Sequence, residues 1–256
     1  MALEASGRPL HARADAPACP ACASQDCRRY TTHKGIELFA CGRCETVFMF
    51  PLPTFEEVEE KYDDCYDGAT SGYFSKVEKK LKRSRGRMAF LSRFAKSGRF
   101  LDIGCNGGFM VEAARERGFE AYGLDLDRVS IAYARETYPG NSYFHGSVEA
   151  FAKEDGPQFD LVYCSEVIEH VPDANSFVTA IAGLLRPGGL LFVTTPDISH
   201  WRRPRDLTKW DGFNPPAHCI YFNPGSLTAL LARHGLAVVK RRPAFKPGIK
   251  LLARKG

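Results

Sequence analysis

The sequence predicts an α/β fold, in which a mostly parallel sheet covered by helices follows a small metal-stabilised module. From Arg99 to Pro196, short apolar segments alternate with helical segments, as expected for parallel strands joined by crossover helices. Five of the nine cysteines fall within the first fifty residues. The 256 residues, 44% hydrophobic and 25% charged, suffice for one large domain with a small appendage, and this composition excludes disorder throughout.

Composition also limits where the protein is expected to act. No run approaches the ~18–20 apolar residues that span a bilayer, so no membrane partner is expected. Residues 1–16 lack the apolar stretch of a signal peptide and are expected to form a disordered tail. An odd number of cysteines without an export signal argues against a disulfide framework. We therefore expect a cytoplasmic protein.

Residues 17–50 carry two C-x2-C pairs, Cys19 with Cys22 and Cys41 with Cys44. Four thiolates from two tight turns complete a tetrahedral site, which is the arrangement of structural Zn2+ and leaves no open coordination position. The intervening stretch favours a hairpin that turns at Lys34-Gly35. We predict a zinc ribbon that derives much of its folding energy from the metal. A redox dithiol is the alternative, but it would need a following helix in a βαβ unit.

Residues 51–97 are expected to form a helical connector. Thr54 and Glu57 have the spacing of a capping box that opens a short helix. A second helix is predicted from about Ser75 to Lys96, because its apolar residues recur at helical spacing. Its basic residues either contact a phosphate-bearing partner or form a solvated face, and the net charge of +5 is too mild to indicate nucleic-acid binding alone. These basic residues are Lys76, Lys79, Lys80, Lys82, Arg83, Arg85 and Arg87.

The first strand–turn–helix unit of the large domain has the features of a nucleotide site. Glycines from Gly104 to Gly108 let the backbone approach a ligand closely. Asp125 ends the next strand, where a carboxylate can accept hydrogen bonds from ribose hydroxyls. The spacing differs from G-x-G-x-x-G, which argues against NAD. Strands are expected at 100–103, 120–124, 142–145, 159–164 and 190–195, and helices at 109–117, 126–138 and 174–185.

Four segments of this domain resemble the motifs of class I S-adenosylmethionine-dependent methyltransferases, in the same order. They are Leu101–Phe109, Gly123–Asp125, Phe159–Val171 and Leu184–Leu191. Asn106 stands where the first motif usually has glycine, and the turn is expected to survive because Asn adopts left-handed backbone angles readily. The resemblance implies a Rossmann-like, seven-stranded, mostly parallel sheet with an antiparallel last strand over residues 98–256. Its closing elements are a helix at 226–234 and strands at 236–240 and 249–253.

The resemblance also implies S-adenosylmethionine as cofactor. Its contacts fall on Asp102, Gly104, Cys105, Asn106, Gly108, Asp125 and Leu126, with Ser147 and Val148 near the adenine and Cys164 beneath the cofactor. The family often has an acidic residue near the adenine, and neither Ser147 nor Val148 supplies one.

Three residues are candidates for the chemistry of methyl transfer. An oxygen nucleophile loses a proton at or before attack, and histidine suits that role near neutral pH. His170, directly after the fourth strand, is the first candidate for the general base, and His218 is the second. Glu166 is expected to orient the cofactor's amino group or His170. The alternative role for His170 is a structural hydrogen bond that holds its loop.

Residues 198–220 lie where the family has a substrate lid. Their Trp and Arg side chains either bind an anionic or sugar-like acceptor or anchor an irregular loop. A zinc ribbon before this core resembles bacterial methyltransferases of sugar, surface-polysaccharide and natural-product biosynthesis, which predicts O- or N-methylation of a small molecule. The alternatives are an RNA methyltransferase, whose ribbon and basic helix bind rRNA or tRNA, and a non-catalytic binding module. The sequence makes no prediction about oligomeric state.

Overall fold

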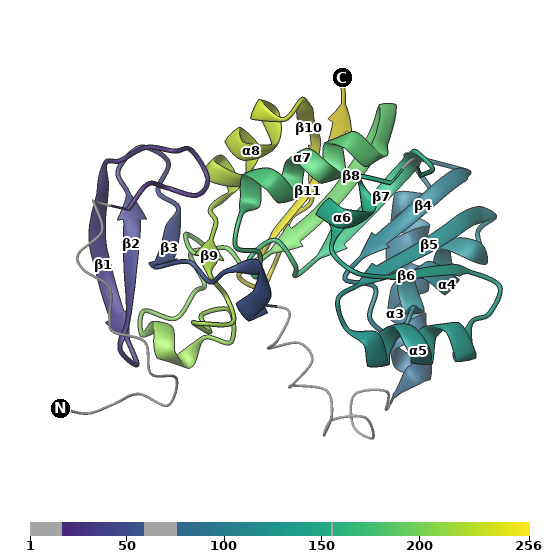
Figure 1. Ribbon diagram of the computed structural model, residues 1–256, viewed down its shortest axis with the longest axis horizontal. Helices are drawn as coiled ribbons and strands as arrows, with labels where there is room; N and C mark the ends of the chain where they lie inside the picture. Colours follow the sequence, from purple (N-terminus) through teal and green to yellow (C-terminus); the bar gives the residue numbers. More distant parts are fainter. Residues whose placement is uncertain (1–16, 59–75, 155) are drawn as a thin grey trace.

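The computed structural model describes residues 17–58, 76–154 and 156–256, and it contains two β-sheets (Figure 1). The small sheet has the strand order β1-β2-β3-β9, and the large sheet has the order β10-β11-β8-β7-β4-β5-β6. The expected N-terminal tail and the second half of the first connector helix lie outside the described residues. The start of that helix is described, and its capping box is confirmed: Thr54 N–H donates to Glu57 Oε2 at 2.8 Å, and Glu57 N–H donates to Thr54 Oγ1 at 3.2 Å.

The small sheet joins the N-terminal segment to a strand far along the chain. Its strands are β1 (Cys27–His33), β2 (Ile36–Cys41), β3 (Val47–Phe50) and β9 (Ile220–Tyr221). The predicted hairpin is confirmed, and its turn residues Lys34 and Gly35 have φ angles of 49° and 81°. β3 and β9 were not predicted, and they pair through Val47 with Tyr221 and Phe48 with Ile220. The ribbon sheet is therefore completed by a strand from the end of the expected lid.

The large sheet confirms the predicted fold class. Neighbouring strands pair in parallel from β6 to β8, whereas β11 is antiparallel to both β8 and β10. The strands are β4 (Gly98–Ile103), β5 (Phe119–Asp125), β6 (Ser142–His145), β7 (Phe159–Ser165), β8 (Leu185–Thr195), β10 (Leu236–Arg241) and β11 (Ile249–Lys255). Parallel pairing brings the carboxyl ends of β4, β5 and β7 to one edge, where ligands bind in open α/β sheets.

Helices cover both faces of the large sheet. One face carries α3 (Val77–Leu91), α4 (Phe109–Arg115) and α5 (Arg128–Thr137), whose apolar residues share one core cluster. The other carries α6 (Val148–Phe151), α7 (Ala174–Leu184) and α8 (Pro224–Arg233), which share the second. α3 ends at Leu91 rather than Lys96, and α6 was not predicted. None of the helices within the described ranges is long and apolar enough to cross a membrane.

The second core cluster is continuous between the two sheets. Leu38 and Phe48 of the small sheet are fully buried, and they belong to the same cluster as Phe222, Leu227 and Leu231 around α8. A ribbon of this size cannot bury enough apolar surface by itself. Its apolar residues are therefore buried against the large domain, and Figure 1 shows β1, β2 and β3 on the side of the molecule where β9 and α8 lie.

Candidate active site and metal centre

A cavity of about 400 Å³ opens at the carboxyl ends of β4, β5 and β7. Six of the residues predicted to contact the cofactor line it: Gly104, Asn106, Asp125, Leu126, Ser147 and Val148. Glu166 and His170 also line it. One concave site thus contains the predicted cofactor residues together with two of the three candidates for the chemistry.

The glycine-rich turn after β4 holds its shape through left-handed backbone conformations. Gly104 has a φ of 74°, and a Cβ at this position would lie 2.5 Å from Cγ2 of Val167. Asn106 has a φ of 50°, as expected of an asparagine that replaces glycine. Its Oδ1 accepts the Gly107 N–H at 2.7 Å, and its own N–H donates to Asp125 Oδ2 at 2.7 Å. The turn and the carboxylate are therefore fixed relative to each other.

Asp125 is held at the end of β5 by backbone donors on both carboxylate oxygens. Besides the Asn106 N–H, the Asp127 N–H donates to Oδ1 at 2.9 Å. Burial raises the pKa of Asp125, and these two hydrogen bonds oppose that shift. Each oxygen retains a lone pair that can accept a hydrogen bond from a ligand hydroxyl.

Four predicted cofactor residues lie outside the cavity lining. Asp102, Cys105 and Cys164 are buried, and burial raises the pKa of each of them well above its ordinary value. Both cysteines are therefore protonated thiols in the core, which suits neither nucleophilic nor metal-binding chemistry. Gly108 begins α4, and a Cβ there would lie 2.6 Å from the Tyr143 hydroxyl. The glycine allows close packing between α4 and β6.

An acidic residue that was not predicted lines the cavity beside Ser147 and Val148, the two residues expected near the adenine. Glu149 follows Val148 in the first turn of α6, and its buried Oε1 has no hydrogen-bond partner. Burial raises the pKa of Glu149. The available sequence signal was Ser147, which caps α6 by accepting the Ala150 N–H at 3.1 Å and so turns the next residues into the site.

His170 and His218 meet edge to face, with ring centroids 4.6 Å apart. Nδ1 of His170 lies 2.7 Å from the Ala217 carbonyl, and Nδ1 of His218 lies 2.9 Å from the Gly212 carbonyl. A carbonyl oxygen only accepts, so each Nδ1 carries the hydrogen and each Nε2 is the basic nitrogen of the neutral ring. Burial lowers the pKa of His218, which favours its neutral form. His170 faces the cavity, and His218 packs behind it.

Two glutamates flank this histidine pair. Glu166 directly follows β7, has a φ of 58° and accepts a hydrogen bond from the Thr194 hydroxyl at 2.7 Å. Glu169 is 1% exposed, and its Oε2 accepts the Thr195 hydroxyl at 2.9 Å while Oε1 has no partner. Burial, with a contribution from Glu166, raises the pKa of Glu169 to about 8. Ligand atoms of Glu169, His170 and His218 all lie within 4.8 Å of one another, so this set could hold a cation.

The expected lid, residues 198–220, closes at its base where the Ile198 N–H donates to the Phe222 carbonyl at 3.0 Å. Phe213 within it packs on His33 of the small sheet, with ring centroids 5.4 Å apart. Trp201 is 82% exposed, and its neighbour Arg202 lies 3.8 Å from the ring centroid of Phe245. The lid's Trp and Arg side chains do not line the cavity.

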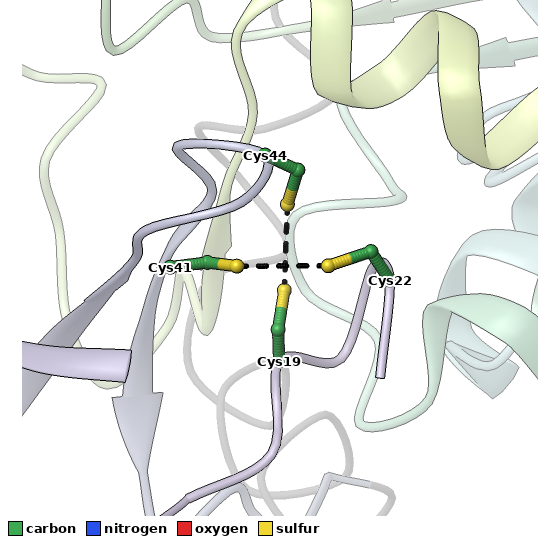
Figure 2. A group of neighbouring side chains, drawn as sticks. All are labelled: Cys19, Cys22, Cys41 and Cys44. Atoms are coloured by element: carbon green, nitrogen blue, oxygen red, sulfur yellow. Dashed lines mark hydrogen bonds between the residues drawn. The ribbon is translucent and has the colours of Figure 1, made fainter. Parts of the chain in front are cut away.

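The four ribbon cysteines converge on one point, as Figure 2 shows. Sγ of Cys19 lies 3.5 Å from Sγ of Cys44, and the Cys22–Cys41 sulfur distance is also 3.5 Å. Zn–S bonds of about 2.3 Å place the sulfurs of a tetrahedral site about 3.8 Å apart, whereas a disulfide requires about 2.0 Å. The four thiols therefore fit a tetrahedral metal ion. Cys27 lies outside this cluster and is a separate free thiol.

The comparisons with known proteins agree with this geometry. The profile of a family described as a methyltransferase domain matches residues 73–241, more than half of the chain. A ubiquinone biosynthesis O-methyltransferase of Aromatoleum aromaticum is 43% identical over 101 residues, which cover 38% of this chain and 43% of that protein. One from Bordetella avium is also 43% identical over 101 residues, covering 38% of this chain and 42% of that protein. The chain thus matches less than half the length of these curated relatives.

Solved structures extend the likeness over more of the chain. The 1,6-didemethyltoxoflavin-N1-methyltransferase of Burkholderia thailandensis has a TM-score of 0.58 at 16% identity, covering 89% of this chain and 98% of its own. The magnesium protoporphyrin IX methyltransferase of Synechocystis, solved with bound SAH, has a TM-score of 0.55 at 17% identity, covering 73% and 90%. At these identities the likeness establishes the fold. The chain therefore belongs to the methyltransferase-domain family, with the fold of class I S-adenosylmethionine-dependent methyltransferases.

Proposed function

We propose that this protein transfers a methyl group from S-adenosylmethionine to an oxygen, or a nitrogen, of a small molecule, such as a sugar or natural-product intermediate. The observation that carries the proposal is the single cavity that contains the Gly104–Asn106 turn, the Asp125 carboxylate and His170. The O-methyltransferase names of the relatives support oxygen as the acceptor atom.

The residues that line the cavity fit the parts of S-adenosylmethionine. Asp125 would accept hydrogen bonds from the ribose hydroxyls, and the Gly104 turn would allow the backbone to approach the ligand. The buried, unpartnered Oε1 of Glu149 would accept the adenine amino hydrogen. When bound, the cofactor supplies an already activated sulfonium methyl, so the protein's task is to position the acceptor and remove its proton.

His170 is our candidate for the general base. The Ala217 carbonyl holds the hydrogen of the neutral ring on Nδ1, and Nε2 would take the proton of the acceptor hydroxyl. His218 would position the His170 ring because the two rings pack edge to face. Glu169 would position it because this buried residue directly precedes His170 in the chain. Glu166, which also lines the cavity, would orient the acceptor or the cofactor's amino group.

We further propose three parts for the chain: a zinc ribbon at 17–50, a helical connector at 51–97 and a methyltransferase domain at 98–256. The geometry of the four thiols supports zinc, and four protein ligands would make the metal structural. None of the eight described cysteines forms a disulfide, which supports a reducing compartment such as the cytoplasm.

The basic side chains of α3 favour a small acceptor over RNA. Arg85 pairs with Glu116, with Nη2 and Oε1 2.5 Å apart, and Lys80 lies 5.3 Å from the ring centroid of Phe109. Arg83 and Arg87 line a second, concave cavity. These four cations therefore do not form one flat basic surface of the kind that RNA would bind. One is in an ion pair, one contacts an aromatic ring and two line a small cavity.

Cofactor binding and turnover test the proposal separately. Calorimetry should show that wild type binds S-adenosylhomocysteine and that Asp125→Asn weakens binding by about tenfold, the loss expected for one charge-assisted hydrogen bond. His170→Ala should bind it like wild type but lose about 10²–10⁴-fold in methyl transfer to a panel of hydroxylated acceptors, the usual contribution of a general base. Absence of cofactor binding by wild type would refute the proposal, and unchanged turnover of His170→Ala would remove His170 as the base.

A further inference from the structure

A second cavity adjoins the proposed active site, and we propose that it binds a phosphate group, above all a diphosphate, of the methyl acceptor. The inference rests on the proposed function, because it assigns a chemical class to the acceptor. The cavity has a volume of about 340 Å³, and Glu166 lines both it and the cofactor cavity. A molecule that fills the second cavity can therefore extend past Glu166 toward His170.

Three parts of the fold bring basic side chains to this cavity. Arg83 and Arg87, one helical turn apart, lie on one face of α3. Arg242 and Lys246 come from the connection between β10 and β11, and Lys250 comes from the start of β11. The antiparallel register pairs Lys250 with Thr194, which itself donates to Glu166, so these cations lie at the edge of the sheet where the chemistry is expected.

The positive charge in this cavity is poorly compensated. None of the five cations lies within ion-pair distance of a carboxylate of the described residues, and Glu166 is the single carboxylate among the lining residues. Burial lowers the pKa of Lys250, and the charges of Arg242, Arg87 and Arg83 lower it further. The lining thus carries four net positive charges around one small volume, and a bound anion would reduce the repulsion between them.

Two of the arginines are held in place for planar recognition. Arg87 donates from Nη1 to the Tyr163 hydroxyl at 2.8 Å, and the Arg242 guanidinium lies 4.5 Å from the ring centroid of Phe90. A guanidinium with a fixed orientation can give two parallel hydrogen bonds to a phosphate. Phe90 and Phe192 supply low-dielectric walls that strengthen the field of the cations.

The amount of charge favours phosphate over carboxylate. A carboxylate brings a single negative charge, whereas a diphosphate brings two or three and offers oxygens to several donors at once. The concave shape, with cations arriving from both α3 and the β10–β11 connection, suits one compact group rather than an extended nucleic-acid strand. The acceptor is therefore a small phosphorylated molecule whose nucleophilic hydroxyl lies on the His170 side of Glu166.

Calorimetry on the full chain saturated with S-adenosylhomocysteine tests this, with inorganic pyrophosphate as the probe. We compare wild type with Arg242→Gln/Lys246→Gln, which removes two cavity cations, and with Arg117→Gln/Arg254→Gln, which removes two exposed cations outside the cavity. Pyrophosphate should bind wild type and the control variant alike. The cavity variant should bind it at least about tenfold more weakly, because it loses two charge-assisted hydrogen bonds to the anion.

Three results would overturn the proposal: no pyrophosphate binding by wild type, equal weakening in both variants, or tighter binding of succinate or of a short RNA oligonucleotide than of pyrophosphate. The proposed function fails by a different measurement, since it requires binding of S-adenosylhomocysteine itself. All three proteins should bind that ligand equally. Normal binding of S-adenosylhomocysteine without pyrophosphate binding would thus refute the phosphate site alone.

Discussion

Asn106 offers a direct test of how the glycine-rich turn is built. Its backbone has a φ of 50°, and its side-chain Oδ1 accepts the Gly107 N–H at 2.7 Å. Asn106→Ala keeps a Cβ and loses the side-chain acceptor, whereas Asn106→Gly loses the same acceptor and removes the Cβ. The two variants therefore separate backbone strain from the hydrogen bond.

The expected magnitudes follow from these two contributions. An ordinary residue in the left-handed region costs about 1–2 kcal/mol, and the lost hydrogen bond costs about 1 kcal/mol. Asn106→Ala should therefore lower the free energy of unfolding by about 2–3 kcal/mol. Asn106→Gly should lower it by about 1–2 kcal/mol, from the hydrogen bond and the greater entropy of glycine in the unfolded chain.

Urea denaturation of wild type and both variants measures the difference, and calorimetry with S-adenosylhomocysteine measures its consequence in the site. Because the Asn106 N–H fixes Asp125, Asn106→Ala should also bind the ligand more weakly than Asn106→Gly. If Asn106→Ala were as stable as Asn106→Gly and bound the ligand equally well, the left-handed conformation would carry no cost and our explanation of the turn would be wrong.

Three further predictions concern the rest of the molecule. Phe48→Ala should lower the free energy of unfolding measured by urea titration by about 3–5 kcal/mol, and the chain should still unfold in one transition, because this buried ring belongs to a core shared by both sheets. Two separate unfolding transitions would contradict the shared core. Chelation of the proposed zinc, or Cys41→Ser, should lower the melting temperature of the whole chain followed by circular dichroism, and an unchanged large-domain transition would show that the ribbon is independent. The hydrogen bond from Arg115 lowers the pKa of Glu112 below its ordinary 4.5, so the folded state favours the carboxylate, and this stabilisation is lost as the pH falls through the lowered pKa. Between pH 5 and pH 3, the free energy of unfolding of Glu112→Gln should therefore fall by about 1 kcal/mol less than that of wild type. Parallel curves of unfolding free energy against pH for the two proteins would refute this.

Local spacing predicted the large sheet, and it also predicted that the turn after β4 and the end of β5 lie together at one cavity. Gly104 and Asp125 follow consecutive parallel strands, and the carboxyl ends of such strands meet at one edge whatever the rest of the chain does. The four ribbon cysteines were predictable for a similar reason, since two tight turns joined by a hairpin leave few alternatives for their side chains.

The parts that escaped prediction depend on contacts between distant segments. β9 has two residues, too few for a periodic pattern, and it exists because β3 offers it an edge. Glu149 lines the cavity at the carboxyl ends of β4, β5 and β7 because it lies on a helix of only four residues. Cations from α3 and from the β10–β11 connection line the same cavity because β11 pairs with β8 in the antiparallel direction. The lid arginines, which the sequence suggested as ligands of an anion, do not line this cavity.

The pairing of β3 with β9 has a consequence for the order in which the protein is made. The ribbon leaves the ribosome before β9, the partner of its outer strand β3, which follows about 170 residues later. During that interval β3 presents an unpaired edge beside the apolar side chains of Val47 and Phe48, which is the type of surface that promotes pairing between chains. Metal binding by the nascent ribbon would fix β1 and β2 early, yet closure of the small sheet waits for synthesis to reach Tyr221.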